Sequence, residues 1–178
     1  VVADSPALAE DALEVIEVDI EPLPVVPDWR VSAANEVVLH EGPGRNVPIT
    51  YTAAKGDAAA AFASAPYVRK EKFRVQRHSA VCMEPRGLLA VWEGALTKLT
   101  LSGAAKVPFA NRKILARHMD LPEECVDLLE YDTGGGFGVR GEFYSEDFLI
   151  PFCARKLNRP VKWIEDRREN LLCSNHSR

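Results

Sequence analysis

The stretch Thr133-Gly-Gly-Gly-Phe-Gly-Val-Arg140 carries more information than any other part of this sequence. Four glycines surround one phenylalanine, and they follow the apolar run Cys125–Tyr131, which is predicted to form a strand. Glycine accepts positive φ angles and lets the backbone approach a ligand closely. Successive amides in such a loop can form a concavity that binds anionic oxygens. The residues alone therefore leave two interpretations open, a structural turn and a ligand-binding loop.

This loop matches neither of the common nucleotide-binding motifs. The dinucleotide fingerprint GxGxxG needs a longer glycine spacing and a helix that opens inside it, and the P-loop ends in Gly-Lys-Ser/Thr. Two alternatives stay open on the residues: a phosphate- or nucleotide-binding domain that uses the loop, and a non-catalytic binding or scaffold module in which the loop makes only a turn.

On the N-terminal side of the loop, apolar periodicity predicts two strands and a helix. The strands are Gly87–Trp92 and Lys98–Leu101, joined by the glycine-containing turn at 93–96. The helix is Pro108–Met119, because apolar residues recur there at helical spacing. Its predicted core-facing stripe is Phe109, Leu115, Ala116 and Met119.

On the C-terminal side, a second helix and another strand are predicted. Ser145–Lys156 has helical spacing, and Pro151 is expected to kink this helix or to divide it into two segments. Pro160–Ile164 is a predicted strand. The predicted inward residues of the helix are Leu149, Phe152 and Cys153. The charged residues that follow the strand are predicted to form a polar turn or helix with a solvated ion-pair cluster: Glu165, Asp166, Arg167, Arg168 and Glu169.

The N-terminal third has weaker patterns. Ser5 is a predicted cap for a helix whose apolar residues continue to Ile16. Prolines, glycines and asparagines across residues 25–51 predict an extended linker. Three further segments are predicted: a strand at Val18–Ile20, a short alanine-rich helix capped by Asp57, and a strand at Tyr67–Val75.

The composition is that of a globular protein, with 178 residues of which 47% are apolar and 27% charged. Strands and helices interleave, which predicts an α+β (mixed α/β) fold. The net charge of −4 gives no electrostatic reason to expect nucleic acid or an anionic membrane as a partner. No apolar run approaches the length of a transmembrane helix, so no membrane partner is expected either.

The cysteines and histidines show no metal-binding pattern. Without a CxxC pair, neither a zinc site nor an iron–sulfur cluster is predicted in this chain. The mostly apolar surroundings of the cysteines predict reduced, structural thiols in a cytoplasmic protein. These cysteines are Cys82, Cys125, Cys153 and Cys173, and the histidines without metal-ligand spacing are His40, His118 and His176.

Five motifs agree in order and spacing with one family. They are His78 with Met83-Glu-Pro-Arg-Gly87, Pro108 to Arg112 with its helix, Leu121-Pro122, Gly134-Gly-Gly-Phe-Gly138 and Arg159–Arg167. Together they resemble the molybdopterin-binding large subunit of xanthine dehydrogenase-type enzymes, a family that includes aldehyde oxidoreductases and aerobic carbon monoxide dehydrogenase. The resemblance is strong from about residue 75 to the C-terminus and weakest at 29–65.

The resemblance implies a domain order. Residues 1–28 would be the C-terminal piece of an α/β-hammerhead-like domain, 29–65 a linker, and 66–178 the N-terminal part of the molybdopterin-binding domain. The start at Val1, without Met or a signal-peptide pattern, is interpreted as a cut. Nothing matches the family's general-base glutamate, which lies far toward the C-terminus. The chain is therefore expected to be a fragment that is inactive alone.

The resemblance also implies a cofactor and a reaction. In that family the glycine loop wraps the molybdenum–molybdopterin cofactor, so Gly134, Gly135, Gly136, Phe137 and Gly138 are the expected cofactor-binding residues. The implied reaction oxidises or hydroxylates a small substrate of the aldehyde, heterocycle or carbon monoxide type, with water as the oxygen source. Electrons would pass to iron–sulfur clusters and FAD on other domains or subunits, which are expected partners together with the rest of the same subunit.

Lys106 departs from the family pattern. The family usually has a glutamine here, near a molybdenum oxygen ligand, so Lys106 is a further candidate cofactor-binding residue and puts the usual substrate in doubt. The alternative is that the segment bends away and Lys106 reaches solvent, since lysines are rarely buried without a partner. His78 and Glu84 lie beside the loop in the family arrangement, and a site role and a structural role are both open for them.

Overall fold

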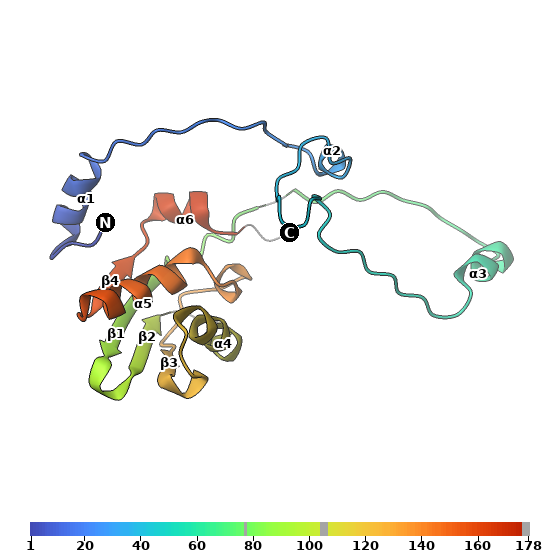
Figure 1. Cartoon of the computed structure of the whole chain (residues 1–178). Helices are drawn as coiled ribbons and strands as arrows, with labels where there is room; N and C mark the ends of the chain where they lie inside the picture. The colour runs from blue at the N-terminus through green and yellow to red at the C-terminus, as the bar shows by residue number, and fades with distance from the viewer. Residues whose placement is uncertain (77, 104–106, 176–178) are drawn as a thin grey trace. The chain divides into compact units, whose positions relative to one another are not determined.

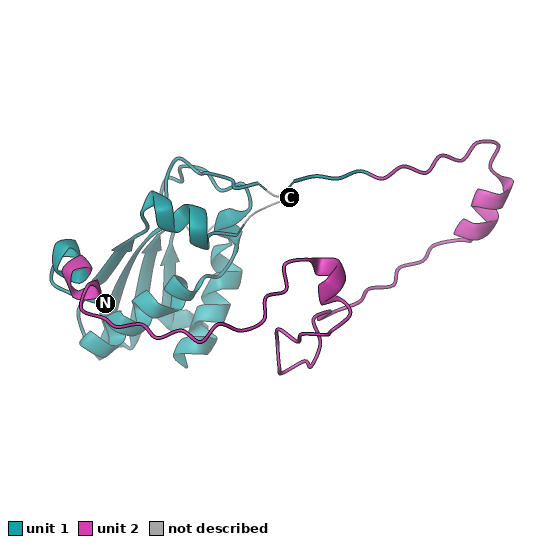
Figure 2. Ribbon diagram, turned by 90° about the horizontal axis from the view of Figure 1, so that it is seen from above, with its two compact units in different colours: residues 1–9, 73–178 teal, residues 10–72 magenta. Residues whose placement is uncertain are grey.

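The computed structural model describes residues 1–76, 78–103 and 107–175, and the chain divides into two compact units (Figure 2). The first unit is Val1–Ala9 together with Phe73–Arg178, and the second is Glu10–Lys72. Every strand found in the described residues belongs to the first unit. The first unit is therefore the one that positions the glycine loop.

A four-stranded sheet forms the centre of the first unit (Figure 1). Its strands are β1 (Gly87–Glu93), β2 (Lys98–Gly103), β3 (Val126–Leu129) and β4 (Val161–Ile164), in the spatial order β3-β2-β1-β4. β1 is antiparallel to both neighbours, whereas β2 and β3 run parallel. Because a parallel pair needs a crossover connection, a helix must lie between β2 and β3 in the chain.

That crossover helix is α4 (Pro108–Met119), which has the predicted bounds. Proline is tolerated at its first position, and Asp120 ends it in the left-handed conformation at φ 52°. Leu115, Ala116 and Met119 are buried as predicted, but Phe109 is 80% exposed and its predicted core position is wrong. Phe109 lies in the first turn, seven positions before Ala116 and thus on the same side of the helix as that residue, so helical spacing alone does not account for its exposure.

Helix α5 (Ser145–Leu157) is one continuous helix with a buried Pro151 inside it, so the predicted division into two segments is wrong. Packing against the sheet has overridden the local preference, as tertiary contacts commonly do in helices. The buried face consists of Pro151 and Ala154. Leu149 and Phe152 are 48% and 41% exposed, so their predicted inward positions are wrong, and Cys153 packs partly buried against the core.

The hydrophobic core lies between the sheet and these two helices. α5 packs against β1 and β4, and α4 packs against β3 and α5. Leu88 and Ala90 of β1 are buried, while Leu89 between them is 39% exposed, because alternate side chains of a strand point to opposite faces. The buried core residues are Leu88, Ala90, Leu99, Leu101, Leu115, Ala116, Met119, Val126, Ala154 and Val161.

Short elements complete the first unit and correct one predicted boundary. The strand predicted at Cys125–Tyr131 is shorter, since Glu123–Cys125 forms the 3-10 turn η2 before β3 begins. The turn predicted between β1 and β2 is confirmed as η1 (Gly94–Leu96). The C-terminal helix is α6 (Arg167–Cys173), and η3 (Val139–Gly141) follows the glycine loop.

Helix α1 (Pro6–Leu13) begins at its predicted cap. Ser5 Oγ accepts a hydrogen bond from the Leu8 amide at 3.3 Å, which satisfies one of the unpaired donors of the first turn. The helix ends at Leu13, so the prediction that it continues to Ile16 is wrong.

The second unit has little regular structure. It contains α2 (Trp29–Ser32), which interrupts the predicted linker, and α3 (Ala58–Ser64), whose predicted cap Asp57 accepts a hydrogen bond from the Ala60 amide. None of residues 10–72 is buried. The strands predicted at Val18–Ile20 and Tyr67–Val75 do not form, because no other strand of the described chain pairs with them.

Candidate functional site

The glycine loop follows β3 and has an unusual backbone. Gly135 has φ +107°, Phe137 has φ +44° and Gly138 has φ +93°. Such angles cost glycine little but strain other residues, and they are uncommon for phenylalanine. Gly134 and Gly136 do not have positive φ angles. Of the four glycines, only Gly135 and Gly138 therefore adopt a backbone conformation that favours glycine.

Gly134 is constrained by packing instead. A Cβ on this residue would lie 2.5 Å from the Cβ of Glu84. Non-bonded carbon atoms prefer about 3.5–4.0 Å, so no other residue fits here without displacing the Glu84 main chain. The loop therefore lies directly against the segment that precedes β1.

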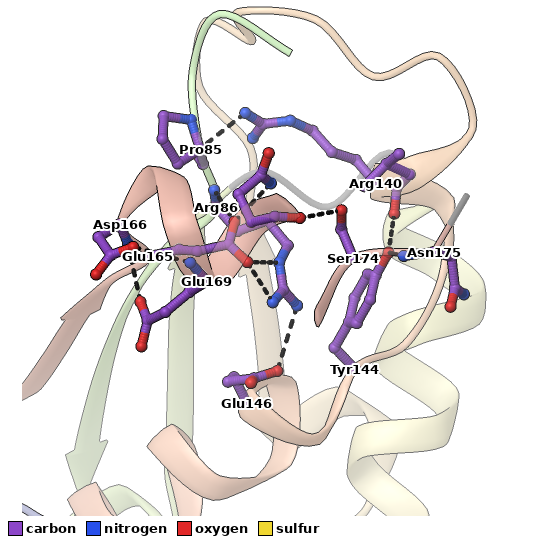
Figure 3. Close-up of polar contacts among 12 residues, drawn as sticks. Pro85, Arg86, Arg140, Tyr144, Glu146, Glu165, Asp166, Glu169, Ser174 and Asn175 are labelled. Atoms are coloured by element: carbon purple, nitrogen blue, oxygen red, sulfur yellow. Dashed lines mark hydrogen bonds and ion pairs between the residues drawn. The ribbon is translucent and has the colours of Figure 1, made fainter. Parts of the chain in front are cut away.

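Glu84 binds the loop through its main chain and its side chain. Its carboxylate Oε2 accepts a hydrogen bond from the Gly134 amide at 2.7 Å, and its own amide donates to the Gly134 carbonyl at 3.3 Å. The same Oε2 lies 2.9 Å from Nη2 of Arg140, whose side chain is 1% exposed. Arg140 also donates to the Glu84 carbonyl and to the Pro85 carbonyl, the second of which is drawn in Figure 3. The first and last parts of the loop are thus tied to one short segment.

The middle of the loop contacts the same segment. The buried Cys82 thiol donates to the Gly136 carbonyl with an Sγ–O distance of 3.6 Å. The preceding residue, Val81, has φ +41°, a strained angle for a β-branched side chain. From the other side, Arg167 of α6 donates to the carbonyls of Cys82 and Met83 at 2.7 and 2.9 Å. The segment 81–86 is held between the loop and α6.

Part of the loop is exposed, although Gly136 within it is buried. Phe137 is 68% exposed. Within the described part of the chain, the amides of Gly135, Gly136, Phe137 and Gly138 donate to no acceptor. Main-chain amides normally have hydrogen-bond partners, and four consecutive ones can surround a polar ligand. These residues therefore fit a flat ligand rich in hydrogen-bond acceptors, such as a pterin cofactor.

A buried ion pair lies next to the ends of β1 and β4 and binds the last residue of the segment 81–86. Gly87 pairs with Ile164, which brings Arg86 and Glu165 side by side just beyond the ladder. The Glu165 side chain is fully buried, and its Oε1 accepts from Arg86 Nη2 at 2.6 Å and Nε at 3.0 Å (Figure 3). Asn170 Nδ2 donates to Oε2 at 2.8 Å, and Glu146 pairs with Arg86 at 3.2 Å.

The predicted solvated ion-pair cluster is therefore wrong. Glu165 points into the protein, and Arg167 binds main-chain carbonyls instead of neighbouring carboxylates. Asp166 and Glu169 cap the start of α6, each accepting the amide of the other at 2.8 Å. The available signal was the place of Arg86 directly before β1 and of Glu165 directly after β4, two antiparallel neighbours.

Burial and hydrogen bonding shift the pKa values of these groups. Burial alone would raise the pKa of Glu165, but hydrogen bonds from Arg86 and Asn170 lower it on balance. Burial opposes the charge of Arg86, yet its contacts with Glu165 and Glu146 raise its pKa. Burial raises the pKa of Tyr144, over whose ring Arg86 lies at 3.9 Å, and it also raises the pKa of Asp147.

The remaining candidate residues differ in whether they contact the glycine loop. Glu84 lies beside the loop, as the family arrangement predicted. His78 has a ring nitrogen 3.2 Å from the Gln76 carbonyl and makes no hydrogen bond to the loop in the described structure. Lys106 and His176 lie outside the described residues. His118 packs on Phe143 and Phe148. No three histidine, cysteine or acidic residues of the described chain gather where a metal ion could be held.

Comparison with known proteins identifies the family of the chain. The family model for the molybdopterin cofactor-binding domain matches residues 39–178. The chain belongs to this family. The predicted resemblance is thus confirmed, and the match includes the sheet, the glycine loop and the segment that carries Glu84.

Individual relatives of this molybdopterin cofactor-binding domain are larger proteins. The gamma subunit of the 6-hydroxypseudooxynicotine dehydrogenase complex of Paenarthrobacter nicotinovorans is 38% identical over all 178 residues, which cover 22% of its length. The carbon monoxide dehydrogenase large chain of Afipia carboxidovorans is 32% identical over the whole chain, which covers 24% of its length. The crystal structure of quinoline 2-oxidoreductase from Pseudomonas putida 86 matches 99% of the chain with a TM-score of 0.87 and 35% identity, over 22% of its own chain.

The chain spans only 22–24% of the length of these relatives. Its described helices include none that is both long and apolar enough to cross a bilayer.

Proposed function

We propose that this chain forms one wall of the molybdenum–molybdopterin site of an oxidoreductase, with Gly134, Gly135, Gly136, Phe137 and Gly138 in contact with the cofactor. The single observation that carries the proposal is the set of unpaired amides in the loop. Four consecutive amides have no acceptor in the described structure, and Phe137 is exposed among them. Family membership favours this function over the scaffold and nucleotide-binding alternatives.

The residues of this chain bind and orient, while the cofactor performs the redox step. When bound, it supplies oxidation or hydroxylation of a small substrate with water as the oxygen source. The loop amides would donate hydrogen bonds to its acceptor atoms, and Phe137 would contact it. Glu84 and Arg140 hold the ends of the loop. No catalytic base is assigned to this chain.

The substrate is a small molecule of the aldehyde, heterocycle or carbon monoxide type. Relatives with 38% and 37% identity are named for the oxidation of nicotine-type heterocycles, so aromatic nitrogen heterocycles are the first class to test. The partners are the remainder of the subunit and domains or subunits that carry iron–sulfur clusters and FAD, consistent with relatives named as subunits of complexes. The cytoplasm is the proposed compartment.

Finer domain assignments follow the same proposal. Residues 1–28 would end a hammerhead-like domain, 29–65 would link it to the next domain, and 66–178 would begin the cofactor-binding domain.

Lys106 would stand beside the cofactor, where an ammonium group can only donate hydrogen bonds and carries a charge. Turnover by Lys106→Gln and Lys106→Met holoenzymes on a substrate panel tests this role. Wild-type rates and preference in both variants would contradict it.

The decisive experiment measures cofactor content. The holoenzyme should contain molybdenum by elemental analysis and pterin by fluorescence after oxidation, and Gly135→Val should lose both. Gly42→Val is the matched control, because a Cβ at Gly42 would meet no atom within 4 Å and Gly42 lies outside the loop. A holoenzyme without molybdenum or pterin would refute the proposed function.

A further inference from the structure

Glu84 occupies a special position, because one carboxylate oxygen serves both the loop and its neighbouring cation. Oε2 accepts the Gly134 amide at 2.7 Å and pairs with Arg140 Nη2 at 2.9 Å. We propose that Glu84 is the positioning residue of the glycine loop and sets the conformation that receives the cofactor. This inference rests on the proposed function and goes beyond it, because Glu84 itself touches only the loop and Arg140.

The main chain around Glu84 is unusually well fixed. Arg140 donates to the carbonyls of Glu84 and Pro85, and Arg167 donates to those of Cys82 and Met83. Arg86, the next residue but one, is bound by the buried Glu165. Two arginines from other segments and one ion pair at its last residue thus hold the five residues 82–86. A carboxylate on so rigid a base can impose its geometry on a flexible loop.

The charge of Glu84 is needed as well as its shape. The Arg140 side chain is 1% exposed, and Glu84 is its carboxylate partner within 4 Å. Nε and Nη1 of Arg140 have no hydrogen-bond partner in the described structure. Hydrogen bonds between ionised groups are shorter and stronger than neutral ones, so the guanidinium and the carboxylate fix each other. Loss of the carboxylate would remove the side-chain contact at each end of the loop and leave only hydrogen bonds to the main chain of Glu84 and Pro85.

The loop depends on Glu84 because few other contacts restrict its backbone conformation. Gly135 and Gly138 have positive φ angles that glycine leaves and re-enters readily. Their amides gain no hydrogen bond within the described chain. The loop is therefore constrained mainly at Gly134 on one side and at Arg140 on the other, and both of those residues bind Glu84.

The test compares three variants of the holoenzyme. Glu84→Ala removes both contacts, and Glu84→Gln keeps an oxygen for the Gly134 amide but loses the charge. Asp127→Asn is the matched control, because Asp127 also pairs with a cation, Lys98 at 2.7 Å, and its side chain is 43% exposed against 45% for Glu84, but it makes no hydrogen bond to the loop in the described structure. Hydrogen exchange of the loop amides, molybdenum and pterin content, melting temperature, and kcat and KM are measured for each.

In Glu84→Ala, hydrogen exchange of the loop amides should be faster than in wild type. Molybdenum affinity or kcat/KM should fall by about 10-fold, as commonly follows the loss of an outer-shell contact. Glu84→Gln should recover part of this loss, and Asp127→Asn should leave loop exchange unchanged. Unaltered exchange and molybdenum content in Glu84→Ala would overturn the proposal, and so would an equal loss in Asp127→Asn. If wild type itself lacks the cofactor, the proposed function fails, and the exchange data still decide whether Glu84 holds the loop.

Discussion

Glu165 binds Arg86 through both its side chain and its main chain. Its Oε1 lies 2.6 Å from Nη2 of the guanidinium, and its Oε2 lies 3.0 Å from the Arg86 amide nitrogen. The Glu165 amide in turn donates to the Arg86 carbonyl at 2.9 Å. These contacts continue the β1–β4 pairing beyond its last residues and into the segment that carries Glu84. The stability of the sheet and the position of the candidate site are thereby linked.

Replacing Glu165 by alanine should destabilise the chain strongly. The change leaves the guanidinium of Arg86 buried without its main partner, and breaking a buried pair in this way costs about 3–5 kcal/mol. Urea unfolding followed by circular dichroism measures the loss. The control is Asp127→Ala, which breaks an exposed pair with Lys98 and should have little effect, since exposed pairs contribute little. Equal losses in the two variants would contradict the buried-pair interpretation.

Stability should depend on pH in opposite ways at two carboxyl groups. The pKa of Glu165 is lowered on folding, so its contribution is present above its ordinary pKa of 4.5 and is lost as pH falls through the folded pKa. The advantage of wild type over Glu165→Gln should therefore grow as pH rises. Burial raises the pKa of Asp147, so its contribution favours the folded state at low pH and is lost as pH rises.

The free energy of unfolding of Asp147→Asn should therefore rise relative to that of wild type as pH increases. Asparagine can keep the hydrogen bond that Asp147 Oδ2 accepts from the Tyr144 amide at 2.8 Å, while the cost of ionising a buried acid disappears. Unfolding free energies measured from about pH 3 to pH 7 test both slopes. Parallel pH profiles for wild type and both variants would refute these assignments.

Substitution of Gly135 by valine should strain the loop by about 1–3 kcal/mol, because valine disfavours the φ of +107° found there. A Cβ at this position would also lie 3.0 Å from the Phe137 ring. Differential scanning calorimetry compares this variant with Gly42→Val, whose Cβ meets no neighbouring atom and which should melt near the wild-type temperature. Loss in the control alone would argue against strain in the loop.

Tyr144→Phe should weaken the connection between α5 and the end of the glycine loop. The hydroxyl of Tyr144 donates to the Val139 carbonyl at 2.7 Å and accepts from the Asn175 amide at 3.2 Å. Loss of a typical hydrogen bond costs about 0.5–1.5 kcal/mol. Because burial raises the pKa of Tyr144, the donor persists at neutral pH. Tyr131→Phe is the control, since Tyr131 is 69% exposed, and chemical denaturation distinguishes the two.

Much of the local structure was predictable from neighbouring residues. Apolar spacing identified β1, β2, β4 and α4, and Ser5 and Asp57 marked two helix starts, because these features depend on residues within one or two turns. The glycine loop was equally visible as a motif. The strand predicted at Tyr67–Val75 was wrong for the complementary reason: a strand requires a partner strand, and none of the described residues supplies one.

The sequence by itself determined the family and the elements that surround the loop, since both are encoded in motifs and short-range spacing. Only the tertiary structure decided which charges are buried and what holds the loop. Glu84 meets Gly134 from 50 residues away, and Arg86 meets Glu165 from 79 residues away. Such pairs form because the order and direction of the strands bring distant segments together, and local backbone preferences carry no information about partners so far along the chain.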